Sequence, residues 1–167
     1  MLQNFLRGLA LCVLMPGMIS AQSAQVGFGG FTGDASQPVE VAADQLEVDQ
    51  TDGSALFSGN VIVIQGEMKL SANTMRVEYA NSADNAANGI SKLFASGNVI
   101  LVNGLEAAEA DNAVYTIASG EIEMTGNVLL TQGQNVMSAE KLVADITNGT
   151  ARLEGRVKTT LGGAPKK

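Results

Sequence analysis

Two carboxylates, Glu121 and Glu123, stand two residues apart and are the side chains best placed for acid–base chemistry. A carboxylate pair catalyses such chemistry when both groups face one shared, protected site. Here the two residues flank Ile122, and on a strand with an apolar inward residue the neighbouring side chains point to solvent. The pair is therefore expected on an exposed surface, where it adds charge and no catalysis.

Other catalytic groups are scarce in this sequence. It has no histidine, which is the commonest general base and metal ligand. Its one cysteine, Cys12, lies in an N-terminal segment that we expect to be removed. The sequence also lacks a nucleophile motif and a cluster of metal-ligating residues. We therefore predict no catalytic residue, no metal, no cofactor and no enzymatic activity.

The charge balance argues against a nucleic-acid partner. The 17 acidic residues outnumber the 10 basic ones and give a net charge of −7, whereas binding to nucleic acid needs clustered Lys and Arg. Lys69, Arg76 and Lys92 are the basic residues that we consider for contact with a phosphate, although exposed charges more often serve solubility.

Residues 1–24 have the features of a secretory signal peptide. Arg7 is the only charge there, and the apolar run over 8–19 is too short to span a bilayer, which takes about 20 residues. Small residues at Ala21 and Ala24 offer cleavage sites for a signal peptidase. The mature chain would contain no cysteine and need no disulfide, so we predict that it is exported to the bacterial periplasm.

Two short sequence elements repeat along the rest of the chain. The first, Ser-Gly-Asn-Val at 58–61, returns unchanged at 96–99 and in altered form at 125–128 and 154–157, so its glycines are 38, 29 and 29 residues apart. The extra residues of the long interval fall in a polar loop over 81–89. A fixed period in this range indicates stacked repeats. The second element keeps the same period and begins at Ala43, Ala72, Ala110 and Ala139.

Within each repeat, apolar and polar residues alternate, which is the pattern of a strand with one buried face. The alternation shifts by one residue at Asp44-Gln45 and again after Ala72, as a β-bulge or a built-in bend requires. No stretch beyond the signal segment has helical spacing. We therefore predict an all-β fold of stacked strands over 38–161, after a flexible Gly-rich linker over 25–37 and before a disordered tail over 162–167.

The alternation also assigns an apolar inner face to the predicted strands. Its core should consist of aliphatic residues and Met, because aromatic residues make up 4% of the sequence and Trp is absent. Met adapts to irregular neighbours, so such an interior suits either a ligand or the filling of gaps. The inward-facing residues singled out are Val39, Val41, Leu46, Phe57, Val61, Val63, Leu70, Met75, Leu101, Tyr115, Met124 and Leu130.

Several stretches resemble the OstA-like domain of the LptA family. They are residues 37–41, 43–49, 55–66 and 70–77, within a resemblance that extends over about 32–161. The resemblance implies a twisted, open β-jelly roll, shaped like a folded taco, whose apolar interior binds the acyl chains of lipopolysaccharide. The inner-face residues thereby become candidate lipid contacts. It also implies a bridge across the periplasm, built from an LptC-like protein anchored in the inner membrane, an LptD-like outer-membrane protein and head-to-tail copies of this chain.

A bridge of this kind joins copies through the unpaired strand edges at the two ends of the stack. The candidate edge residues are Val39 and Val41 in the first strand and Val157 and Thr159 in the last. Two other classes stay open: a structural β-solenoid of the envelope with a sealed core and, as the weakest, an enzyme on a β scaffold. A sealed core is packed to crystal-like density, whereas a carrier leaves an apolar groove.

Overall fold

The computed structural model describes residues 24–27, 33–49, 51, 53–80 and 89–162. These residues form one antiparallel sheet of 11 strands, in which the long strands pair with their neighbours in sequence. In that part of the chain, no helix has the length and apolar character needed to cross a membrane. The strands are β1 (Ala24–Gly27), β2 (Glu40–Ala42), β3 (Gln45–Asp49), β4 (Ser54–Gln65), β5 (Met68–Tyr79), β6 (Ile90–Asn103), β7 (Glu106–Thr116), β8 (Glu121–Gln132), β9 (Asn135–Asp145), β10 (Thr150–Glu154) and β11 (Lys158–Thr160).

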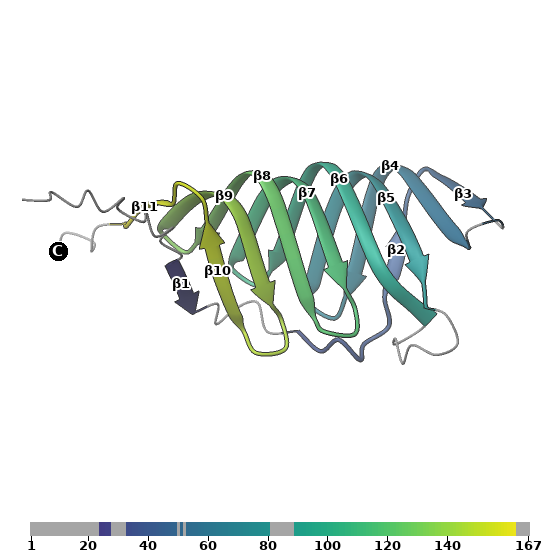
Figure 1. Ribbon diagram of the computed structural model, residues 1–167, viewed down its shortest axis with the longest axis horizontal. Helices are drawn as coiled ribbons and strands as arrows, with labels where there is room; N and C mark the ends of the chain where they lie inside the picture. The colour runs from purple at the N-terminus through teal and green to yellow at the C-terminus, as the bar shows by residue number, and fades with distance from the viewer. Residues whose placement is uncertain (1–23, 28–32, 50, 52, 81–88, 163–167) are drawn as a thin grey trace, which may run out of the picture.

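The sheet is folded in half across the middle of its long strands (Figure 1). Between β4 and β5 the regular pairing stops after Ser58–Thr74 and resumes at Val61–Ala72, so two residues of β4 oppose one of β5. This is a β-bulge, which bends a strand and increases its twist. Register shifts at the same level interrupt the pairing from β4 through β9, so all these strands bend along one crease.

The crease divides the sheet into two walls that face each other. The hairpin turns lie at the far edges of the walls, and the side where these edges meet is called the mouth (Figure 1). Wall A contains β3, β10 and the strand halves 54–58, 74–79, 90–96, 112–116, 121–125 and 141–145, with β1 at its end. Wall B contains β2, β11 and the halves 61–65, 68–72, 99–103, 106–110, 128–132 and 135–139.

Backbone conformations at the crease explain the first repeated element. Gly126 has a φ of 81° and Asn127 has a φ of 49°, so both are in the left-handed region. Glycine adopts this region without strain, and Asn tolerates it better than most other residues. The pairs at Gly59 and Gly97 have the same conformation, and in the fourth copy Arg156 takes the place of Asn with a φ of 40°.

The second repeated element meets the first at the crease. Asn127 Nδ2 donates a hydrogen bond to Asp111 Oδ2 across 2.8 Å, and Asp111 belongs to the second element. Each bend is thus closed by one side chain from each element, which is why the two elements keep a common period. The corresponding pairs are Asn60 to Asp44 at 2.8 Å, Asn98 to Asn73 at 3.3 Å and Arg156 to Glu140 at 2.7 Å.

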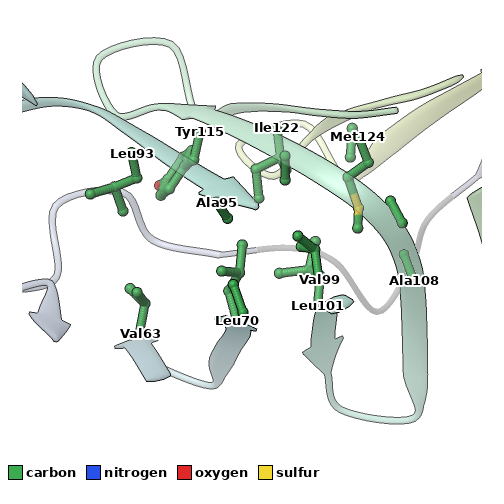
Figure 2. Packing of buried hydrophobic residues seen from close by; sticks show 14 of the residues in the cluster. Val63, Leu70, Leu93, Ala95, Val99, Leu101, Ala108, Tyr115, Ile122 and Met124 are labelled. Carbon is green, nitrogen blue, oxygen red and sulfur yellow. The ribbon is translucent and has the colours of Figure 1, made fainter. Parts of the chain in front are cut away.

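Apolar side chains from the two walls pack against each other between the crease and the mouth. Figure 2 shows Tyr115, Ile122 and Met124 of wall A lying across from Leu70 and Leu101 of wall B. All five are at most 2% exposed. Burying an aliphatic or aromatic side chain stabilises a fold by roughly 1.5–3 kcal/mol. The folded sheet therefore owes its stability to this two-walled core.

The segment before β2 differs from the flexible linker predicted over 25–37. β1 pairs with β10 in antiparallel register, and residues 33–37 make hydrogen bonds that are described below. A glycine-rich composition favours flexibility, but its backbone N–H and C=O groups still pair with a free strand edge. The predicted signal peptide and C-terminal tail lie outside the described residues, except for Ala24 and Gly162.

Two of the four predicted edge residues lie in strands at the ends of the sheet. Val41 lies in β2 and Thr159 lies in β11, and each of these strands has one paired neighbour. Val39 and Val157 lie just outside these strands and pack, half-buried, against the core. The prediction missed β1, which covers the edge of β10 and is the outermost described strand of wall A at that end.

Replacing Gly126 with Ala should destabilise the protein more than the same change at Gly133. At 126 the new Cβ would lie 2.9 Å from Asp111 Cβ, whereas at 133, where φ is +58°, it would meet nothing within 4 Å. Left-handed strain costs about 1–2 kcal/mol at either position, and the clash adds about 1–3 kcal/mol at 126. Urea unfolding measures both losses, and equal losses would contradict the close approach of Asp111 at the crease.

Candidate ligand-binding interior

The structure places most of the predicted inner-face residues between the two walls. Val39, Val41 and Phe57 are half-buried and pack against the core. Strand alternation identified these positions because successive side chains point to opposite faces of a sheet. The fully buried members, at most 2% exposed, are Val61, Val63, Leu70, Met75, Leu101, Tyr115, Met124 and Leu130.

Leu46 differs from the other predicted inner-face residues, because it is 57% exposed. Its strand register is as expected: Leu46 pairs with Phe57 and so shares the inner side of wall A. However, β3 is the outermost of the described strands at its end of the sheet, and its one partner among them is β4. Alternation predicts the side that a residue faces but not whether another element covers it. Val48, 60% exposed, lies on the same side, so the two residues form an apolar end patch.

At the mouth the two walls differ in chemistry. The inner side chains of wall A stay apolar up to the turns, where Ile117, Ile122 and Ile146 are at most 1% exposed. In wall B the inner residue nearest each turn is polar, except at Met68. These polar residues follow one another across neighbouring strands, and we call them the polar row: Gln65, Asn103, Glu106, Gln132 and Asn135.

A hydrogen bond joins the walls across the mouth. The Tyr115 hydroxyl of wall A donates to Gln65 Oε1 of wall B at 2.7 Å, and these residues are 0% and 4% exposed. Burial raises the pKa of Tyr115 to about 12, because the charged phenolate would lose its hydration. Tyr115 is therefore a neutral donor at physiological pH.

Residues 33–38, which we call the strap, also cross the mouth. Gly33 donates its N–H to the carbonyl oxygen of Ile146, in the turn between β9 and β10 of wall A, at 2.9 Å. Gln65 Nε2 of wall B donates to the carbonyl oxygens of Ala35 at 3.1 Å and Gln37 at 3.0 Å. Figure 1 shows the strap running along the side of the hairpin turns toward β2. The Gln65 side chain therefore connects both walls and the strap.

Sequence reasoning missed the polar row. Its signal was present, because Gln65, Asn103 and Gln132 each occupy an inward position directly before a turn glycine. Polar residues beside a glycine are also typical of turns, so apolar alternation alone ends each strand one residue early. The structure shows that the strands continue to these residues and that their side chains face the interior.

The charged residues considered for chemistry lie on the outer face. Glu123 forms an ion pair with Lys141 at 2.8 Å, as expected for an outward-facing carboxylate beside the inward Ile122. Arg76 forms an ion pair with Glu78 and a cation–π contact with the ring of Phe94, so its charge already has partners within the protein. Within the described residues, no group of three or more His, Cys, Asp or Glu is placed to hold a metal ion.

A model of one protein family matches residues 40–150, which is more than half of the chain. That family is described as LptA/(LptD N-terminal domain) LPS transport protein. The chain belongs to this family. The resemblance to the LptA family that the sequence predicted is thereby confirmed, and the family is described as one of LPS transport proteins.

Three relatives of this LptA-family chain show how the similarity is distributed. An uncharacterised protein of Rhizobium meliloti (strain 1021) is 29% identical over 105 residues, which cover 61% of this chain and 56% of that protein. The lipopolysaccharide export system protein LptH of Pseudomonas aeruginosa is 39% identical over 51 residues, covering 30% of this chain and 29% of LptH. LptA of Escherichia coli (strain K12) is 41% identical over 46 residues, covering 28% and 25%. The matches thus span about half of the first relative and under a third of the others.

A solved structure confirms the fold of this family member. The crystal structure of LptH from Pseudomonas aeruginosa superposes with a TM-score of 0.68 and 21% sequence identity, over 78% of this chain and 99% of that one. LptH is described as the LptA homologous periplasmic component of the conserved lipopolysaccharide transport device. The predicted all-β, open β-jelly roll is therefore correct for this chain.

Replacing Tyr115 with Phe tests the bond across the mouth. The ring is kept, but Gln65 Oε1 loses its buried donor, so unfolding should become easier by about 1–3 kcal/mol at pH 8. The pKa of Tyr115 is raised from 10.0 to about 12, so this stabilisation is complete below pH 10 and is lost as the pH rises through about 12.

Urea unfolding between pH 8 and pH 12 should therefore show the stability gap between wild type and Tyr115→Phe closing above pH 10. The matched control is Tyr79→Phe, because Tyr79 is 50% exposed. A gap that stays constant up to pH 12 would contradict the buried, neutral donor.

Proposed function

We propose that this chain carries lipopolysaccharide in the periplasm, with the acyl chains held between walls A and B. The observation that supports this most strongly is the inner face, which is apolar from the crease to the edge of wall A and along the stack from Phe57 to Leu153. Each acyl CH₂ moved from water into such an interior contributes roughly 0.8 kcal/mol. Membership of a lipopolysaccharide transport family supports the choice of ligand.

Opening of the walls would leave the sheet intact. The backbone pairing runs within each wall and is already interrupted at the crease, so bending there breaks few additional sheet bonds. Across the mouth the walls are connected by the Tyr115–Gln65 bond and the strap. An acyl chain entering the interior would cover the apolar surface that opening exposes. Met75, Met124 and Met137 adapt readily to such a change.

A structural β-solenoid with a sealed core is the second candidate. It is favoured by the closed interior, where Leu101, Met124 and Leu130 are 0% exposed. A core packed at the density of protein interiors has no room for a ligand. The two candidates differ in whether the walls separate in the working protein, so the test has to probe the interior in cells.

A photoreactive phenylalanine analogue in place of Phe57 provides this test. Phe57 is half-buried on the inner face, and an aromatic probe preserves its shape. In living cells it should form a crosslink to lipopolysaccharide, detected as a mass-shifted band that reacts with a lipopolysaccharide antibody. The control is the same probe at Leu56, the preceding residue of β4, which is 41% exposed on the outer side. Equal labelling, or no labelling of a folded protein, would favour the sealed core.

The proposed bridge uses the two ends of the stack. Among the described strands, β2 and β3 end the sheet on one side with an unpaired edge each, and β1 and β11 end it on the other. Unpaired strand edges pair readily with strands of another chain. The apolar end patch of Leu46 and Val48 lies beside the edge of β3 and would be covered by a neighbour. Copies of this chain, an LptC-like protein and an LptD-like protein are the partners proposed for these ends.

Localisation in the periplasm completes the proposal. It rests on the signal-like segment over residues 1–24 and on the description of LptH as a periplasmic component. Because β1 begins at Ala24, cleavage after Ala21 would preserve that strand, whereas cleavage after Ala24 would remove its first residue.

Replacing Leu46 with Lys should weaken self-association without lowering stability. Lys at a strand edge opposes pairing with another strand, and Leu46 is already exposed, so the core is untouched. Sedimentation velocity should show a smaller average mass, while the thermal midpoint stays within about 2 °C of wild type. Leu105→Lys is the control, since Leu105 is 93% exposed in the turn between β6 and β7, away from both ends. Unchanged assembly of Leu46→Lys would exclude this end patch from the contact.

A further inference from the structure

The polar row has properties that an interior for acyl chains does not explain. Gln65, Asn103 and Glu106 are between 1% and 7% exposed, although they lie at the mouth. Burying polar side chains is unfavourable unless they are hydrogen-bonded. Wall A has isoleucine and alanine at the same level of the mouth, so the fold itself does not require polar residues there. The row is therefore a candidate for binding a polar group.

Glu106 has an unused acceptor. Its Oε1 accepts a hydrogen bond from Gln132 Nε2 at 2.6 Å. Its Oε2 is buried and has no hydrogen-bond partner among the described residues. A carboxylate only accepts hydrogen bonds, and those from hydroxyl or N–H donors to a charged oxygen are among the stronger ones in proteins. A ligand at this position would therefore have to bring a donor.

Gln65 shows how the row binds polar groups. Its amide donates to two strap carbonyls, those of Ala35 and Gln37, and accepts from Tyr115. The strap thus lies along the mouth with its polar backbone against wall B. A ligand whose polar part follows the same path would present its donors and acceptors to the same row.

We propose that the polar row binds neutral hydroxyl and amide N–H groups of an acylated saccharide, at the junction between its acyl chains and its sugars, with Glu106 Oε2 as the principal acceptor. This inference rests on the proposed function, because it locates the polar part of the ligand whose chains lie between the walls. A carboxylate disfavours a phosphate at close range. The phosphates of such a ligand therefore lie away from Glu106, and recognition at the row depends on uncharged donors.

The test compares two ligands that share the interior but differ at the mouth. One is purified lipid A, an acylated glucosamine disaccharide, and the other is palmitic acid, which has no sugar. Displacement of a fluorescent fatty acid from the full mature protein gives both dissociation constants. Glu106→Gln keeps the acceptor for Gln132 but puts an NH₂ donor in place of the unpartnered oxygen. It should weaken lipid A binding about tenfold and change palmitic acid binding less than about twofold.

Two further variants complete the design. Glu109→Gln is the matched control, since Glu109 lies on the same strand with its side chain exposed on the outer face, and it should change neither constant. Glu106→Asp withdraws the carboxylate by one methylene, so it too should weaken lipid A selectively, and it replaces Glu106→Gln if that variant does not fold. Circular dichroism and thermal melting verify folding.

The outcomes separate the two proposals. Suppose that wild type binds both ligands. If both Glu106 variants then leave lipid A binding unchanged, or weaken the binding of both ligands equally, the role of the polar row is overturned and the carrier function stands. Wild type that binds neither ligand overturns the carrier function itself, and the polar row falls with it.

Discussion

The bend of the long strands at the crease is the constraint on which the rest of this structure depends. On β4 three residues separate the inward Phe57 from the inward Val61, whereas on β5 two residues separate Ala72 from Met75. That difference of one residue is the bulge, and it keeps apolar side chains inward on both walls. Without it, one wall would turn its polar face inward, because a one-residue slip exchanges the two faces of a strand. The bridging side chains, such as Asp111 to Asn127, hold this geometry in each repeat.

The walls that the crease creates are unequal, and their inequality bears on function. Wall A is apolar to its edge, whereas wall B ends in polar side chains that face the interior. An amphiphile between the walls would thus meet a hydrocarbon-like surface on one side and hydrogen-bonding groups on the other side of the same opening. Gln65 links this boundary to the strap and to Tyr115, so the groups that hold the mouth closed would also be those nearest to the head group of such an amphiphile.

Structural features that depend on the local pattern of residues could be predicted from the sequence. Period-two alternation located the inner face from Val61 to Leu130, and the one-residue shift of that alternation at Asp44-Gln45 and after Ala72 predicted the bend that the structure shows at the crease. Coverage by a distant strand is not local, so alternation placed Leu46 on the inner side but gave no sign that it would be 57% exposed. β1 was missed for the same reason, since its partner, β10, is distant in sequence. Glu106 was missed because polar residues near turns are common, and its burial is visible only when both walls are present.

The crease also makes this molecule modular in length. Each 29-residue repeat adds one pair of strands, one bulge with its bridging residue, and a matching slice of both walls. Neighbouring strands lie about 4.8 Å apart, so one more repeat would extend the interior by roughly 10 Å. A gene could therefore lengthen or shorten such an interior by tandem duplication or deletion of whole units, while its cross-section stayed the same.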